Sequence, residues 1–170
     1  MKISLVPSST RRRLRTAAVT ALLAATTVAT GGIAHAESNP TIDLNSNGDD
    51  TTLSMEKCAE HSEDFRFRFY YSPDYKGAWV NVGHNIYDMK SIDVTAAPDR
   101  ALYFCDNGAG GGQQAANNAA SAYNWYEGYE ATIFYSLGYR GAWDTVRPRS
   151  GISLLPNTRN NNRSINFRRG

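Results

Sequence analysis

YYSPDYKGAW at residues 70–79 returns as FYSLGYRGAW at residues 134–143. Six of the ten positions are identical, and the Tyr/Phe and Lys/Arg differences preserve the side-chain type. A second block, Asn-Asn-x-x-Ser, occurs at residues 117–121 and again at residues 160–164. Because the two blocks recur in the same order, the sequence predicts a duplicated structural unit.

The residues around both copies alternate as half-buried strands do. Residues 65–71 read FRFRFYY, which places three Phe side chains on one face and two Arg side chains on the other. Residues 131–135 follow a similar pattern, and Ser-Pro-Asp and Ser-Leu-Gly turns come after the two segments. Residues 113–123 tolerate a helix, but the glycines before them and two Asn within them allow only a short helical turn. The chain is therefore predicted to be all-β.

Each copy of the repeat spaces two aromatic residues and a glycine in the same way. The residues are Tyr70, Tyr75 and Gly77 in the first copy, and Phe134, Tyr139 and Gly141 in the second. This spacing resembles the Greek-key signature of the βγ-crystallins, in which a hairpin folds over so that its aromatic rings pack and Gly supplies a positive φ. The alternative is a pair of unrelated aromatic hairpins in another sandwich.

The resemblance implies a βγ-crystallin-like two-Greek-key β-sandwich over residues 58–170, with one motif at about 65–124 and the other at about 130–167. Gly77 lies 40 residues before Asn117, whereas Gly141 lies 19 before Asn160, so the first motif carries an insertion at about 83–116.

The start of the chain is typical of a signal peptide. It has a basic segment, then an apolar run from residue 17 to about 29, and then Ala34-His35-Ala36 as a cleavage site. We expect residues 1–36 to be removed, by either the general or the twin-arginine route, and the protein to be secreted and extracellular. A retained membrane anchor is the alternative. The whole chain has 18 basic and 16 acidic residues, and the leader holds 5 basic and no acidic ones, so the mature form is 13 − 16 = −3.

Residues 37–57 are rich in Ser, Asn, Asp and Thr, and are predicted to be a flexible acidic linker. Cys58 and Cys105 both lie in the exported part, where the oxidising environment favours one disulfide between them. A pair of reactive thiols is the alternative.

In calcium-binding βγ-crystallins, the loop Asn/Asp-Asn/Asp-x-x-Ser/Thr-Ser supplies oxygen ligands. The resemblance implies the ligands Asn117, Asn118 and Ser121 for one site and Asn160, Asn161 and Ser164 for the other. Ala122 and Ile165 stand in place of the last Ser, and each Asn/Asp position is the neutral Asn, so Ca²⁺ binding is expected to be weak. Capping of turns by the same Asn and Ser side chains is the equal alternative.

No catalytic motif stands out, and the mature chain holds only His61 and His84, so we expect a non-enzymatic binding protein. The leader, the cysteine pair and the two repeated blocks together resemble the secreted microbial peptidase inhibitors of βγ-crystallin fold, whose founding members inhibit metalloproteinases. The candidate inhibitory loop is Asp106, Asn107 and Gly108, within 106–112.

The partner implied is a secreted protease, with no nucleic acid and no membrane, and the protein is expected to be a monomer. The alternatives are a calcium-binding extracellular structural protein and a killer-toxin-like antimicrobial βγ-crystallin.

Overall fold

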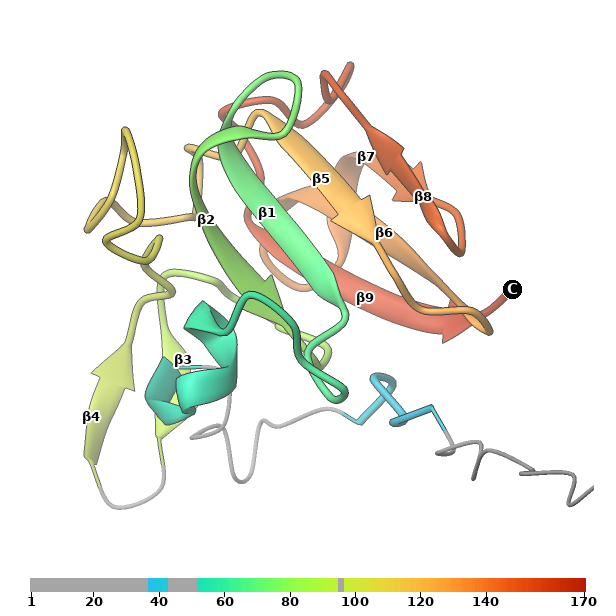
Figure 1. Ribbon diagram of the computed structural model, residues 1–170, viewed down its shortest axis with the longest axis horizontal. Helices are drawn as coiled ribbons and strands as arrows, with labels where there is room; N and C mark the ends of the chain where they lie inside the picture. Colours follow the sequence, from blue (N-terminus) through green and yellow to red (C-terminus); the bar gives the residue numbers. More distant parts are fainter. Residues whose placement is uncertain (1–36, 43–51, 95–96) are drawn as a thin grey trace, which may run out of the picture. The chain divides into compact units, whose positions relative to one another are not determined.

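The computed structural model describes residues 37–42, 52–94 and 97–170 (Figure 1). They form a 3₁₀ helix, η1 (Met55–Cys58), and strands in three antiparallel sheets. The first sheet has the order β2 (Lys76–Val82), β1 (Phe67–Ser72), β5 (Ser121–Asn124) and β8 (Ser150–Ile152). The second has the order β7 (Arg140–Val146), β6 (Tyr129–Ser136) and β9 (Ser164–Arg169). β3 (Ile92–Val94) and β4 (Ala97–Arg100) form a separate hairpin.

The predicted alternation of the first strand is confirmed. Phe65, Phe67 and Phe69 are buried, while Arg66 and Arg68 are only half-buried on the opposite face. The Phe67 ring packs edge-to-face against Phe167 of β9, with ring centroids 5.7 Å apart. Because β1 and β9 belong to different sheets, the core lies between the two sheets, as in a sandwich.

Each half of the chain contributes backbone pairing to the sheet of the other half. β8 of the second half pairs with β5 of the first through Ala122↔Ile152. Reciprocally, Ile86 of the first half forms a bridge with Ile165 of β9. This exchange, with a folded hairpin in each half, makes the fold a βγ-crystallin-like two-Greek-key β-sandwich, and the predicted fold class is confirmed.

The predicted domain limits change in two places. Ile86 and Met89 bond to β9 and to the residue before it, so the insertion of the first motif begins after them and not at residue 83. The ends of the expected linker are also held to the domain. The Glu37 carboxylate accepts from the Gly128 amide at 3.0 Å, and Pro40 O accepts from the Asn85 amide at 3.1 Å.

Residues 55–58 form η1, so the prediction of a flexible linker does not hold for residues 37–42 and 55–57. The expected signal peptide at 1–36 and the linker residues 43–51 lie outside the described residues. A membrane-spanning helix, which would have to be long and apolar, is not found in the part of the chain that the structure describes.

Candidate functional site

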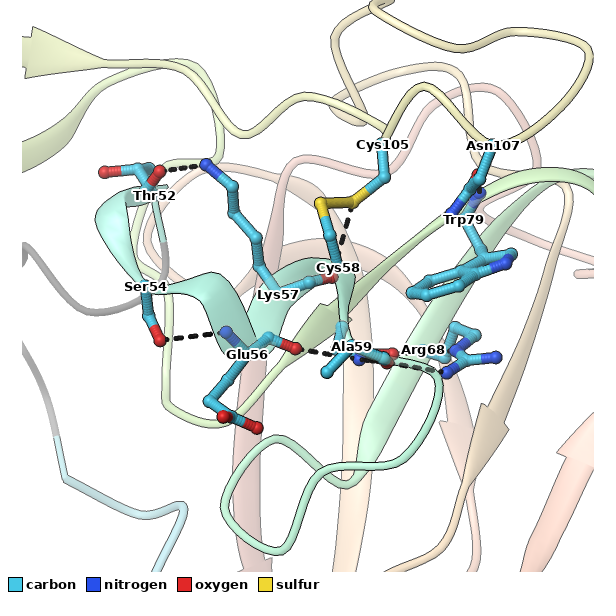
Figure 2. The surroundings of a disulfide bond; sticks show 11 residues. Thr52, Ser54, Glu56, Lys57, Cys58, Ala59, Arg68, Trp79, Cys105 and Asn107 are labelled. Atoms are coloured by element: carbon cyan, nitrogen blue, oxygen red, sulfur yellow. Dashed lines mark hydrogen bonds between the residues drawn. A yellow bond between two sulfur atoms is a disulfide. The ribbon is translucent and has the colours of Figure 1, made fainter.

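The candidate inhibitory loop is anchored by a disulfide between Cys58 and Cys105 (Figure 2). The two Cα atoms lie 5.8 Å apart across a sequence separation of 47, so the predicted pairing is confirmed. Cys58 ends η1, whose N-cap Ser54 accepts from the Glu56 amide at 3.1 Å. The Asn81 side chain of β2 donates to the backbone oxygens of Glu56 and Ala59, at 2.9 and 2.7 Å, and so holds η1 against the sheet.

Residues 101–113, called the cover loop here, lie along the outer edge of β2. The Ala78 amide donates to Ala109 O at 2.8 Å, and the Cys105 amide donates to Trp79 O at 3.0 Å. The Trp79 amide donates to the Asn107 side-chain oxygen at 3.0 Å. β2 is the last strand of its sheet, so the cover loop bonds backbone groups on an edge that would otherwise be open to pairing with another strand.

The cover loop is compact because it bonds to itself and packs closely on β1. Its turns include bonds from the Gly111 amide to Gly108 O at 3.0 Å and from the Gly112 amide to Phe104 O at 3.1 Å. Gly110 has φ +91°, and a side chain there would overlap the Tyr71 ring. The Phe104 ring packs edge-to-face against the same tyrosine, with centroids 5.8 Å apart. The contacts of Gly110 and Phe104 with Tyr71 hold the loop against β1.

The residues predicted from sequence as inhibitory lie in the exposed part of this loop that bonds to β2. Asp106, Asn107, Gly108 and Ala109 are all exposed. The side-chain oxygen of Asn107 accepts from the Trp79 amide of β2, so Asn107 holds the loop in its conformation. The Asp106 carboxylate is the charged group of the exposed run. The site is thus one exposed carboxylate on a backbone that is hydrogen-bonded to β2.

The two Asn-Asn loops form a pseudo-symmetric crossing between the halves. The Asn117 amide donates to Asn162 O at 2.7 Å, and in the equivalent bond the Asn160 amide donates to Ala119 O at 2.9 Å. Asn117 and Asn160 have φ of 64° and 55°, a left-handed conformation that Asn tolerates better than most residues. Asn118 and Asn161 donate to the carbonyls of Gln114 and Arg159, at 2.9 and 3.2 Å.

The two serines expected as ligands instead clamp the folded hairpins. Ser121 Oγ accepts from the Tyr75 amide and donates to Ser72 O, at 3.1 and 2.7 Å. In the same way, Ser164 Oγ accepts from the Tyr139 amide and donates to Ser136 O, at 3.0 and 2.7 Å. Both serines are completely buried.

Ser121 and Ser164 therefore stabilise the folded hairpins through hydrogen bonds to the backbone, which is the kind of role that the turn-capping alternative predicts for these side chains.

Positive charges also lie at both loops. With the Asn117 side-chain nitrogen donating to Asn162 O, its side-chain oxygen accepts from Lys90 Nζ at 3.1 Å. Arg163 Nη2 donates to Asp88 Oδ2 at 2.7 Å. Burial would raise the pKa of Asp88, but hydrogen bonds from Arg163 and from the Lys90 amide, together with their charges, lower it below its usual value. The Ser121 and Ser164 hydroxyls are already bonded within the hairpins, and the Lys90 ammonium lies at the Asn117 side-chain oxygen, so these residues do not fit Ca²⁺.

We therefore expect calcium to leave the stability of the protein unchanged. The melting temperature should differ by less than about 1 °C between chelator and ~10 mM Ca²⁺, because stabilisation requires a ligand that binds the folded form. Calorimetry under both conditions checks this. A rise of several degrees that is lost in the double variant Asn118→Ala, Asn161→Ala would restore the calcium hypothesis.

Sequence reasoning missed an aromatic and cationic cluster beside η1. The Arg68 guanidinium carbon lies 3.7 Å from the centroid of Trp79 and 5.1 Å from that of Trp125. Its Nε donates to the Asn81 side-chain oxygen at 2.7 Å, so Arg68 also fixes the residue that holds η1. The alternation of Arg and Phe in residues 65–69 placed Arg68 on the outer face, but Trp79 comes from β2 and Trp125 from the segment that follows β5.

The two histidines of the described residues lie in different surroundings. The His84 ring packs edge-to-face on Phe65 with centroids 5.4 Å apart, and burial lowers its pKa. His61 lies in a pocket of about 140 Å³ together with Glu60, Glu63 and Arg66. Within the described ranges, no three His, Cys, Asp or Glu side chains come close enough to hold a metal ion.

No protein-family model and no curated protein matches the sequence. Several solved structures are similar in fold. A βγ-crystallin domain from Flavobacterium johnsoniae shares 16% identity with a TM-score of 0.41, covering 62% of this chain and 96% of that one. The βγ-crystallin from Ciona intestinalis shares 8% with a TM-score of 0.42, covering 60% and 98%. The N-terminal domain of protein S shares 18% with a TM-score of 0.42, covering 61% and 94%. The fold assignment rests on the strand order and register described above, and these similarities assign no function.

Proposed function

We propose that the chain is a secreted, non-enzymatic binding protein that inhibits a secreted peptidase through the exposed part of the cover loop. The observation that carries this proposal is the exposed run 106–109, which is braced by the Cys58–Cys105 disulfide and by three hydrogen bonds to β2. A loop that is already ordered loses little conformational entropy on binding, so its contacts contribute more fully to affinity.

The chemistry of this exposed part favours a metallopeptidase as the target. The sulfur of Cys105 is held in the disulfide, so no thiolate can coordinate the metal ion of a peptidase. Asp106 is exposed, and its carboxylate is a group that Zn²⁺ accepts as a ligand. Asp106 then contacts the active site, while Asn107 and the disulfide hold the backbone around it.

Peptidase assays with the purified, disulfide-bonded protein test this proposal. The protein is titrated into a panel of secreted metallo- and serine peptidases. The variant Asp106→Ala is compared with a control, Arg159→Ala, which deletes an exposed charge in the other half of the molecule. Asp106→Ala should weaken inhibition of a metallopeptidase by about tenfold or more, equal to about 1.4 kcal/mol, with an unchanged melting temperature.

Asn107→Ala should also weaken inhibition, but by loosening the loop, and should speed hydrogen exchange at the Trp79 amide. If micromolar wild-type protein leaves the whole panel active, the inhibitor proposal fails. Growth inhibition of other microbes without peptidase inhibition would favour the antimicrobial alternative.

Export belongs to the same proposal. The disulfide suits an oxidising compartment, and Glu37, the expected first residue after cleavage, already has its carboxylate bound to the Gly128 amide. N-terminal sequencing of protein from the culture medium should begin at Glu37. Material that carries residues 1–36 would contradict this cleavage site.

A further inference from the structure

The second Greek-key motif repeats the residues on which the cover loop lies in the first motif. The cover loop contacts Tyr71, Gly77, Ala78 and Trp79 through the Phe104 ring, Gly110, and the backbone of Ala109 and Cys105. The equivalent residues of the second motif are identical in type: Tyr135, Gly141, Ala142 and Trp143. The receiving surface has therefore been duplicated together with the hairpin.

The described part of the second motif provides no loop of this length over Tyr135 and Ala142, although Asn157 and Thr158 bond to Trp143 and Asp144 further along β7. Its chain passes from β7 directly into β8, which pairs with the first sheet. β7 remains the outermost strand in the order β7-β6-β9, as Figure 1 lets the reader follow.

Equivalent residues of the two motifs differ in solvent exposure. Ala78 is 0% exposed under the cover loop, whereas Ala142 is exposed. Tyr135 and Trp143 are 48% and 59% exposed, although their counterparts Tyr71 and Trp79 are half-buried.

Space for a covering segment exists at this surface. One pocket, of about 330 Å³, is lined by Ala142, Trp143 and Asn157. A second, of about 260 Å³, is lined by Tyr135, Ser136 and Leu137 together with Asn117 of the first Asn-Asn loop and Asn161 and Arg163 of the second. The two pockets lie at equivalents of residues that the cover loop occupies in the first half.

We propose that this surface, defined by Tyr135, Gly141, Ala142 and Trp143, binds a polypeptide segment of a partner protein. The cover loop specifies the chemistry of that segment. In the partner segment, a backbone carbonyl accepts from the Ala142 amide and an Asn or Asp side chain accepts from the Trp143 amide. Glycines and an aromatic ring of the segment pack on Tyr135. Pairing of this kind adds a segment to an open sheet edge.

Two local features refine the choice of partner. Trp143 O already accepts from the Asn157 side chain at 3.1 Å, so the partner needs no donor in the place of the Cys105 amide. Arg140 is exposed at the start of the same strand and favours an acidic residue in the segment. The cover loop of a second copy is tied to its own η1 by the disulfide and to its own β2 by hydrogen bonds, so we assign the segment to a different protein.

The cover loop itself provides a defined probe. A synthetic peptide of residues 102–113 with Cys105→Ser is titrated into the ¹⁵N-labelled, disulfide-bonded protein, and amide chemical shifts are followed. We expect saturable shifts at Ala142, Trp143 and Tyr135 at high-micromolar to millimolar peptide, while Ala78 and Trp79 stay unchanged. The peptide with Asn107→Ala should bind several-fold more weakly.

A matched pair of variants distinguishes binding at this surface from nonspecific binding of the peptide to exposed apolar side chains. Tyr135→Ala should weaken the peptide at least fivefold, whereas Leu154→Ala, which removes a similarly exposed apolar side chain at 46%, should not. The absence of saturable shifts at ~5 mM peptide, or equal effects of the two variants, would overturn the proposal. A dimer in sedimentation velocity that the peptide dissociates would also overturn it, because the occupant would then be a second copy.

Discussion

Replacing Cys58 and Cys105 together by Ser should lower the free energy of unfolding by about 4 kcal/mol. The disulfide closes a loop with a sequence separation of 47, and in the chain-entropy model a loop of that length stabilises the folded state by about this amount. Chemical denaturation of the wild type and the double variant, followed by circular dichroism, measures the difference. The double replacement leaves no single thiol to form dimers.

The loss should be concentrated at the cover loop and η1. Amide exchange at Ala78, whose hydrogen bond goes to Ala109, should accelerate far more than exchange at Val80 in the middle of β2. Cys105 is 7% exposed and packs in the core, so Cys58→Ala with Cys105→Ala separates the crosslink from the burial of a Ser hydroxyl. A loss below about 1 kcal/mol in both double variants would mean that the hydrogen bonds alone hold the loop.

The folded hairpins were predictable because their geometry is local. Tyr75 and Tyr139 have φ of 59° and 60°, and Gly77 and Gly141 have φ of 76° and 83°. Ten residues of sequence therefore encode the same chain reversal twice, and the aromatic spacing indicates it without knowledge of the rest of the fold. The disulfide was equally accessible, because two cysteines allow one pairing.

The exchange of pairing between the halves was not predictable in the same way. β8 has only three residues, all half-buried, and Ile86 forms a single bridge, so neither gives a periodic pattern. Their positions depend on partners that are far away in sequence. The roles of Ser121 and Ser164 were unpredictable for the same reason. A Ser hydroxyl can bind a cation or hold a hairpin, and its neighbours in the folded chain determine which of the two it does.

Replacing Tyr126, which the sequence does not single out, should destabilise the protein as strongly as loss of the disulfide. Tyr126 is completely buried, its ring lies 5.5 Å from Phe167 and 5.9 Å from Tyr129, and its hydroxyl donates to Asp64 O at 2.5 Å. Tyr126→Ala should cost about 3–5 kcal/mol through the cavity it leaves, and Tyr126→Phe about 1–2 kcal/mol through the lost hydrogen bond. Urea unfolding at neutral pH measures both. If the two variants lose the same amount, the ring does not contribute to the core as this packing requires.

The hydroxyl of Tyr126 should also make stability depend on alkaline pH. Burial raises the pKa of Tyr126 from 10.0 to about 12, despite hydrogen bonds that lower it. A pKa that is higher in the folded state stabilises that state fully below pH 10, and the contribution is lost as the pH rises through 12. Two pKa units correspond to about 2–3 kcal/mol.

Tyr126→Phe removes this group, while Tyr70 and Tyr75, whose pKa values burial also raises, remain in both proteins. The free energy of unfolding of the wild type should therefore fall more steeply than that of Tyr126→Phe between pH 10 and 12, and the two should approach each other at the top of that range. Parallel curves in urea unfolding at pH 8, 10, 11 and 12 would show that the Tyr126 hydroxyl ionises as readily in the folded chain as in the unfolded one.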